Sequence, residues 1–419
     1  MRFRSLLDLV PFLPAILAQT GNSSKGSTNC RCLYGQSCWP SEQDFSSLSA
    51  QLSQPLIRPV PPASACYPVG NPSGNCSDVQ QNWSDANWRA DQPGAYENIN
   101  FETYTNRNDS ISGCYLNTTL GLPCDQGSVP PIGVDARTVE DVQAAVRFAG
   151  QHNLRLVVKN TGHDYLGRSA GRNAFMIWTH HLKNISYDGN FIPEGASNNE
   201  VVPALTLGAG VQWREAYAAA AEQQRFITGG ISSGMSVGAA GGWVMGGGHS
   251  AFSAKYGLGV DNAVQFTIVK ADGDHVIANA HNNSDLFWAL RGGGAGSWGV
   301  VTSVTYKTYD LVPLVMSVIN AVMLAYTVET WTAGDSGDIV RQARQRIAQE
   351  VRRLDPISPD SATYMNEASL YEPDFRKSFF GSHYDRLRSI KRKYDPGSLF
   401  LVAEGVGSED WDGSLICPV

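Results

Sequence analysis

One loop carries the histidine that is best placed to do chemistry. His163 lies in the segment Gly162-His-Asp-Tyr-Leu-Gly-Arg-Ser169, directly after the apolar stretch Leu154–Val158. That stretch is predicted to be a buried strand, and the loop at the carboxyl end of a strand is a common place for ligand-binding residues in α/β layers. A lone histidine is more often structural than functional, so its neighbours decide how it is interpreted.

Glycine is concentrated around this candidate site. The chain has 419 residues and 42 glycines, more than the roughly 7% of average usage. They cluster in three places: Gly229–Gly230, Gly238 to Gly248, and Gly292 to Gly299. Such density lets successive backbone N–H groups approach a bound anion, so a phosphate-bearing cofactor is expected. The alternative is that these glycines only form tight turns.

Several other ligand classes are excluded. The segment Gly294-Ala-Gly-Ser-Trp-Gly299 has the spacing of a dinucleotide fingerprint, but a predicted helix, Asp285–Arg291, precedes it and a strand follows it. The fingerprint requires the opposite order. The chain has no G-x-x-x-x-G-K-[ST] and no His-Glu-x-x-His motif, so neither a P-loop nor a metal site is expected. A net charge of −7 argues against nucleic acid as a partner.

The amino terminus is typical of a secretory signal. Arg2 and Arg4 precede an apolar stretch from Leu6 to Leu17, so residues 1–18 are predicted to be a cleavable signal peptide. The stretch is too short to span a membrane, and no membrane anchor is expected. A secreted glycoprotein is the prediction. The Asn-x-Ser/Thr acceptors are Asn22, Asn75, Asn82, Asn108, Asn117, Asn184 and Asn282.

The eight cysteines lie near the two ends of the chain. Cys417 is close to the carboxyl terminus, and the others precede residue 125. An even number in a Pro-, Ser- and Asn-rich segment predicts disulfide bonds that stabilise a region with little core of its own. Cys114 and Cys124 bracket a short loop and are the pair we expect first. Residues 19–127 are therefore predicted to be an irregular, disulfide-linked and glycosylated region.

Regular structure is predicted after that region, beginning with a strand–helix–strand unit. Gly133–Ala136 is the short first strand. Thr138 is the expected N-cap of the helix, with Asp141 in the reciprocal position of a capping box, and Gly150 is expected to end it. The buried strand Leu154–Val158 follows.

Further elements follow toward the carboxyl terminus. Trp213–Gln223 is predicted to be an Ala-rich helix and Val300–Tyr309 a strand with alternating apolar residues. One strand is expected at Val315–Tyr326, and residues 339–354 form an amphipathic helix.

Taken together, these motifs resemble those of the berberine-bridge-enzyme-like group, which belongs to the vanillyl-alcohol-oxidase superfamily of FAD oxidoreductases. The segments that carry the resemblance are Gly162–Ser169, Gly238–His249, Asp285–Gly294 and Lys391–Phe400. They occur in the family's order, and the match covers roughly residues 128–309 and 361–411. The cysteines at the amino terminus and the ending Gly405–Trp411 resemble its secreted fungal branch, which includes proteins like isoamyl alcohol oxidase and chanoclavine synthase.

The resemblance implies an α+β fold with four parts after the signal. Residues 19–127 are the N-terminal region, and 128–309 are a PCMH-type FAD-binding domain of two subdomains. Residues 310–363 are a shortened α/β substrate domain, since only 53 residues separate Asp310 from Tyr364. Residues 364–419 are a C-terminal segment that returns to the FAD domain.

The resemblance also implies the cofactor and its residues. His163 matches the histidine that is bonded to the flavin 8α-methyl carbon. Many relatives have a second tether, a cysteine before the central glycine run, but Gly234-Met-Ser-Val-Gly238 stands there. FAD linked through His163 alone is therefore expected. The remaining positions expected along the cofactor are Gly162, Gly167, Ser169, Gly229, Gly238, Gly241, Gly242, His249, Val300 and Val301. His249 is equally well interpreted as a satisfied buried histidine.

Catalysis in this family pairs proton removal from the substrate with hydride transfer to flavin. Tyr364-Met-Asn-Glu367 resembles the Tyr-x-Asn-Tyr strand of plant relatives, in which the last tyrosine is the base. Glu367 stands in that position and is the expected base if burial raises its pKa. The alternative is a surface carboxylate paired with an arginine. Tyr165 and Asn366 are expected to orient the substrate or the flavin edge.

The expected function is oxidation of an alcohol or secondary-metabolite scaffold, with a small-molecule substrate and O2 as partners and a monomeric chain. Two alternatives stay open. One is a flavin-binding member with little or no activity, because the substrate domain is truncated. The other is a secreted carbohydrate oxidase.

Overall fold

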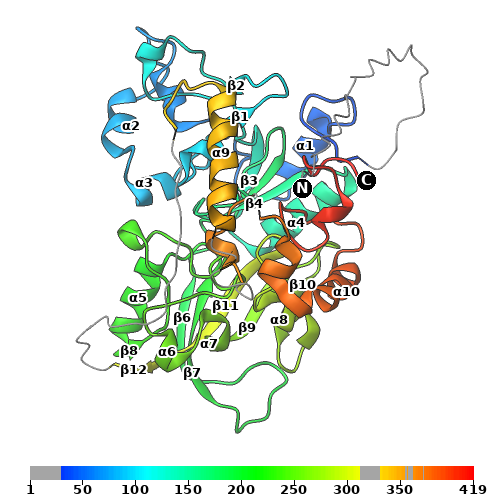
Figure 1. Ribbon diagram of the computed structural model, residues 1–419. Helices are drawn as coiled ribbons and strands as arrows, with labels where there is room; N and C mark the ends of the chain where they lie inside the picture. Colours follow the sequence, from blue (N-terminus) through cyan, green and yellow to red (C-terminus); the bar gives the residue numbers. More distant parts are fainter. Residues whose placement is uncertain (1–29, 312–330, 354–355, 357–361, 371) are drawn as a thin grey trace, which may run out of the picture.

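The computed structural model describes residues 30–311, 331–353, 356, 362–370 and 372–419. The fold is α+β, as expected, and the described residues contain two larger sheets of different kinds and two short two-stranded pairs (Figure 1). The predicted strand Val315–Tyr326 lies outside the described residues.

The first sheet is parallel and contains the predicted strand–helix–strand unit. Strands β3 (Ile132–Asp135), β4 (Leu156–Lys159) and β5 (Phe175–Trp178) pair in the order β3-β5-β4, and helix α4 (Val139–Gln151) connects β3 to β4. Both hydrogen bonds of the predicted capping box are present. The Thr138 side chain accepts from the backbone N–H of Asp141, and the Asp141 side chain accepts from the backbone N–H of Thr138.

The boundaries of this unit differ slightly from those predicted. Gly150 does not end α4, which continues to Gln151. Asn153, with a φ of 49°, takes the left-handed conformation that follows many helices, and asparagine tolerates that conformation. The buried strand after it begins at Leu156 instead of Leu154.

The second sheet is antiparallel and has the order β10-β9-β11-β7-β6. Its strands are β6 (Ile185–Phe191), β7 (Val202–Gly208), β9 (Ala263–Val269), β10 (His275–Asn279) and β11 (Val300–Lys307). The predicted strand Val300–Tyr309 is divided, because Tyr309–Asp310 forms β12 and pairs with β8 (Arg225–Phe226). Four helices accompany this part of the chain: α5 (Trp213–Glu222), α6 (Ser253–Tyr256), α7 (Gly259–Asn262) and α8 (Ser284–Leu290).

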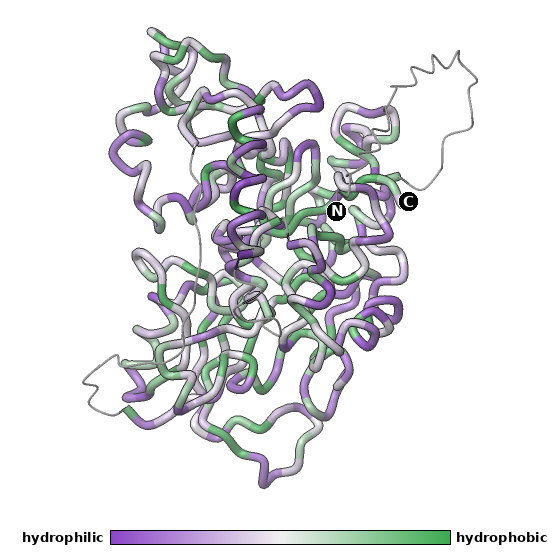
Figure 2. Tube along the Cα trace, in the orientation of Figure 1, coloured by the Kyte–Doolittle hydropathy of each residue, from purple (hydrophilic) through white to green (hydrophobic). Residues whose placement is uncertain are grey.

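Two buried clusters hold the sheets together. One joins the antiparallel sheet to α5, α8 and the C-terminal helix α10 (Tyr384–Tyr394). The other surrounds α4 and includes Val269 and Val300 of the antiparallel sheet together with Leu399 and Phe400. Hydrophobic residues accordingly gather along the strands in Figure 2. Because α4 contacts both sheets, it fixes their relative position.

The N-terminal region has little regular structure, as predicted. It contains three helices, α1 (Glu42–Ser49), α2 (Cys76–Asn82) and α3 (Ala86–Ala90), and the hairpin β1 (Tyr104–Thr105) with β2 (Ile111–Ser112). Cys114 and Cys124 form the expected disulfide bond. The other bonds join Cys32 to Cys38, Cys66 to Cys76 and Cys30 to Cys417.

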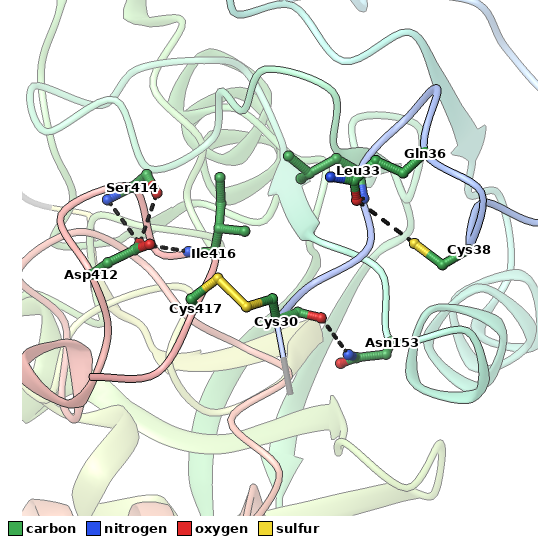
Figure 3. Close-up of a disulfide and its surroundings, with 9 residues drawn as sticks. All are labelled: Cys30, Leu33, Gln36, Cys38, Asn153, Asp412, Ser414, Ile416 and Cys417. Atoms are coloured by element: carbon green, nitrogen blue, oxygen red, sulfur yellow. Dashed lines mark hydrogen bonds between the residues drawn. A yellow bond between two sulfur atoms is a disulfide. The ribbon is translucent and has the colours of Figure 1, made fainter. Parts of the chain in front are cut away.

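The carboxyl-terminal part returns to the rest of the molecule. Helix α9 (Gly337–Arg352), the predicted amphipathic helix with slightly different ends, lies against the β1–β2 hairpin through an ion pair between Arg341 and Asp109. Figure 3 shows the Cys30–Cys417 bond, which joins the first described residue to the carboxyl end. Among the described residues, no helix is long and apolar enough to cross a bilayer.

Candidate functional site

A cavity lies where four segments meet, and the loop after β4 forms one wall. The other walls come from residues 237–245, from residues 295–301 at the start of β11, and from residues 400–402. Seven of the predicted cofactor residues line the cavity: Gly162, His163, Ser169, Gly238, Gly241, Gly242 and Val301.

Four other predicted cofactor residues lie away from this cavity. Val300 is buried in the cluster around α4. A side chain at Gly229 would collide with Trp213, and one at Gly167 would collide with Phe101. Both glycines therefore serve packing. His249 is exposed and hydrogen-bonded to Glu367, so the interpretation as a buried, satisfied histidine is wrong.

The cavity fits a polar, extended ligand such as FAD. Asn160 Oδ1 and Ser169 Oγ are buried, line the cavity and have no hydrogen-bond partner among the described residues, and such atoms in a folded protein are expected to bind a ligand or water. A side chain at Gly238 would collide with the amide of Asn160, whereas one at Gly242 would meet no atom within 4 Å. Glycines at these positions therefore let the protein backbone approach a bound ligand closely.

Sequence reasoning missed several residues of this cavity. Asn160, Thr161, Asp164 and Arg168 come from the same loop as His163. They lie within or directly beside the segment Gly162–Ser169, so their closeness to His163 in the sequence could have predicted that they line the same cavity. Trp243 comes from the glycine run, and Phe400, Leu401 and Val402 come from the carboxyl-terminal segment. For these last three, the resemblance predicted only that the carboxyl-terminal segment returns to the FAD domain, and the fold shows which of its residues reach the cavity.

His163 is held at one edge of its ring. Its Nε2 lies 2.7 Å from Ser236 Oγ and 3.7 Å from Glu97 Oε1. Burial, and secondarily the positive charge of Lys159, lower the pKa of His163 to about 4. The imidazole is therefore neutral near pH 7 and retains a lone pair that can act as a nucleophile.

A buried cluster of charges lies behind His163. Burial lowers the pKa of Lys159 to about 7, and its Nζ donates a hydrogen bond of 2.9 Å to the Gln92 carbonyl. Arg89 forms a buried ion pair with Glu102. Burial also raises the pKa of Glu97 to about 7. Except for Lys159, these residues belong to the N-terminal region, for which sequence reasoning predicted no contribution to the site.

A second polar cluster adjoins the glycine run. Glu367 Oε1 lies 2.8 Å from His249 Nε2, and this hydrogen bond raises the pKa of His249. Asn366 Nδ2 donates to the Trp243 carbonyl at 2.9 Å and to the Tyr364 hydroxyl at 2.8 Å. Trp243 also lines the cavity, so the cluster borders it. Tyr165 is exposed on its loop, and no contact brings it into this cluster among the described residues.

The segment Tyr364–Glu367, which resembles a strand motif of plant relatives, is not a strand in this chain. Met365–Glu367 forms a 3₁₀ turn, in which the Glu367 N–H donates to the Tyr364 carbonyl at 3.0 Å. In a strand, neighbouring side chains would point alternately to opposite faces. In this turn, Tyr364 and Glu367 both face His249. The Glu367 partner is a histidine, and the predicted surface pairing with an arginine is not observed among the described residues.

Comparisons with known proteins agree with this geometry. Residues 130–279 match the model of the FAD binding domain, and residues 363–407 match that of berberine and berberine-like proteins. An uncharacterized FAD-linked oxidoreductase of Arthroderma benhamiae is 42% identical over 315 residues, which are 74% of this chain and 53% of that protein. The FAD-linked oxidoreductase asqF of Emericella nidulans is 41% identical over 312 residues, with the same shares. The chain thus spans about half the length of the curated relatives it matches.

Solved structures give the same result. The VAO-type flavoprotein MtVAO615 of Myceliophthora thermophila superposes with a TM-score of 0.79 at 26% identity, covering 93% of this chain and 100% of that one. The VAO-type flavoprotein MtVAO713 of the same fungus has the same fold, with a TM-score of 0.71 at 20% identity and coverage of 91% and 98%. The resemblance seen in the motifs is therefore confirmed: this chain belongs to the berberine-bridge-enzyme-like family of FAD-linked oxidoreductases in the vanillyl-alcohol-oxidase superfamily.

Proposed function

We propose that this protein is a secreted oxidase that binds FAD covalently through His163 and oxidises an alcohol or a secondary-metabolite scaffold. The observation that supports this most directly is the neutral His163 at the wall of a cavity that also presents unpartnered polar atoms and a glycine-rich backbone. FAD supplies hydride acceptance from the substrate, and O2 takes the electrons as hydrogen peroxide. Four disulfide bonds suit a secretory compartment.

Different residues of the cavity would make different contacts with FAD. Gly238, Gly241 and Gly242 leave backbone open to the cofactor, and the hydroxyl of Ser169 and the amide of Asn160 supply polar partners. No cysteine lies near the glycine run, so we propose a single covalent link.

The proton acceptor belongs to the cluster of Tyr364, Asn366, Glu367 and His249. Glu367 was the expected base, but its side chain is 37% exposed. Tyr364 is better placed, because Asn366 and the backbone N–H groups of Gly248 and His249 face its hydroxyl oxygen. Burial raises the pKa of Tyr364 above its ordinary value, and these donors oppose that effect only in part. We propose that Tyr364 accepts the proton and that Glu367 and His249 adjust its environment.

A second candidate function is flavin binding without turnover. It is suggested by the short stretch of 53 residues between Asp310 and Tyr364, where the resemblance implies only a shortened substrate domain. A secreted carbohydrate oxidase is the other reading of the same site. Release of peroxide with a panel of alcohols and sugars distinguishes these possibilities, because only an active oxidase produces it.

The covalent link is tested by denaturing the purified protein in acid. Wild-type protein should precipitate yellow, and His163→Ala should release all its flavin to the supernatant. His281→Ala is the matched control, since that histidine pairs with Glu200 away from the cavity lining and should leave the attached flavin unchanged. Purified wild-type protein without flavin would contradict the proposed cofactor.

A further inference from the structure

His163 and Ser236 share a hydrogen bond. Ser236 Oγ lies 3.0 Å from the Ser233 carbonyl and 2.7 Å from His163 Nε2. The hydroxyl has one proton, so when it donates that proton to the carbonyl, which can only accept, the same oxygen accepts from His163 Nε2. The proton of the neutral imidazole is then on Nε2, and the lone pair is on Nδ1.

Glu97 faces the same ring edge from another part of the chain. Its Oε1 is buried, lies 3.7 Å from His163 Nε2 and has no hydrogen-bond partner in the part of the chain that the structure describes. Glu97 follows Tyr96, whose backbone N–H donates to Glu102, so the buried ion pair of Arg89 with Glu102 anchors this segment. The N-terminal region thus delivers a carboxylate without a partner to the histidine.

We propose that Ser236 and Glu97 prime His163 for attachment to FAD: Ser236 fixes the tautomer that leaves Nδ1 nucleophilic, and Glu97 accepts the Nε2 proton as the bond forms. This inference rests on the covalent link proposed above. It assigns to the N-terminal region a direct part in maturation of the cofactor.

The step balances as follows. A bond would form between Nδ1 and the 8α carbon, and one C–H bond of that methyl group would break, with its proton released to solvent. The two electrons of that C–H bond would pass to the flavin ring and then, with two protons, to O2 as hydrogen peroxide. Alkylation at Nδ1 leaves the ring cationic while Nε2 keeps its proton. A cation buried beside Lys159 is disfavoured, and transfer of the Nε2 proton to Glu97 removes that charge.

The charges around Glu97 define a pH dependence. Its carboxyl group is surrounded by Arg89 and Asp85 from the α3 segment, Lys159 from β4, and His163 itself. Burial raises the pKa of Glu97 to about 7, against the opposing effects of Arg89 and Lys159. Since only the carboxylate accepts a proton, attachment should accelerate as the pH rises through about 7.

The test follows acid-stable flavin as a fraction of total flavin in the purified full chain over time. Ser236→Ala should slow attachment roughly tenfold, the effect of losing one orienting hydrogen bond. Glu97→Gln should slow it about 10²-fold and abolish the rise with pH. Both variants should still bind flavin that acid releases, which shows that the cavity is intact.

Two matched variants serve as controls. Glu200→Gln alters another carboxylate–histidine pair, and Ser197→Ala removes a hydroxyl that bonds to Glu200; both should attach flavin at the wild-type rate. Flavinyl-histidine isolated after proteolysis should be substituted at Nδ1. Attachment of Glu97→Gln and Ser236→Ala at the wild-type rate, or substitution at Nε2, would overturn this inference. Absence of acid-stable flavin in the wild type would instead overturn the proposed link itself.

Discussion

At the scale of single residues, the environment of a side chain decides its chemistry more than its type does. Tyr364 and Glu367 lie three positions apart and both approach His249, yet the phenol is surrounded by three hydrogen-bond donors and the carboxylate is partly exposed. The sequence motif identified only Glu367 as a candidate base. The donors that distinguish them come from Asn366 and from the backbone of the glycine run, which only the folded chain brings together.

We predict that Tyr364→Phe slows reduction of the flavin by about 10²–10⁴-fold, because the substrate proton loses its acceptor. Glu367→Gln should slow it less, since His249 and Tyr364 remain. Anaerobic stopped-flow absorbance, with any alcohol or sugar that reduces the wild-type flavin, measures both rates. Tyr165→Phe is the control and removes only an exposed hydroxyl. A greater loss in Glu367→Gln than in Tyr364→Phe would assign the proton to Glu367.

At the scale of elements, nearby residues were sufficient to predict the secondary structure of a segment whose conformation depends on its own sequence. The α4 capping box follows from Thr138 and Asp141 alone, and the structure contains it. The 3₁₀ turn at Met365–Glu367 could not be read from its residues, because Asn366 is held by the carbonyl of Trp243, far away in sequence. The same limit applies to Phe400, which long-range packing brings to the cavity.

The capping box leads to a prediction about stability. Asp141 is buried and also accepts from the backbone N–H of Ser53 at 2.7 Å and its hydroxyl at 2.6 Å. Burial alone would raise the pKa of Asp141, but the hydrogen bonds from Ser53, Arg137 and Thr138 outweigh it and the pKa is lowered. Asp141→Asn should therefore reduce the free energy of unfolding at pH 7 by about 1–3 kcal/mol.

The pH dependence of that loss checks its cause. A carboxyl group with a lowered pKa in the folded state contributes stability above its unfolded value of about 4, and this contribution disappears as the pH falls through the folded value. The difference between wild type and Asp141→Asn in urea unfolding should therefore shrink in acid. Asp44→Asn alters the equivalent capping residue of α1, which is only half-buried, and should have a smaller effect. An equal effect of both variants would contradict the role of burial.

At the scale of the whole molecule, the N-terminal region is part of the flavin-binding unit. It was predicted to be an irregular, disulfide-linked segment. The structure agrees on its irregularity but places Tyr96 and Glu97 against the loop of His163. Cysteine spacing predicted the local Cys114–Cys124 bond, whereas the Cys30–Cys417 bond joins the two ends of the described chain. Only the tertiary fold specifies that second pairing.

These two bonds should differ in their effect on stability. A disulfide bond that closes a longer loop restricts the unfolded chain more, and the sequence separations are 387 and 10 residues. Loop entropy gives a difference of about 3 kcal/mol. Replacing both Cys30 and Cys417 by serine should thus lower the free energy of unfolding by more than the same change at Cys114 and Cys124. Urea unfolding followed by tryptophan fluorescence measures both losses. A larger loss at the short loop would show that packing around each bond, and not chain entropy, determines its contribution.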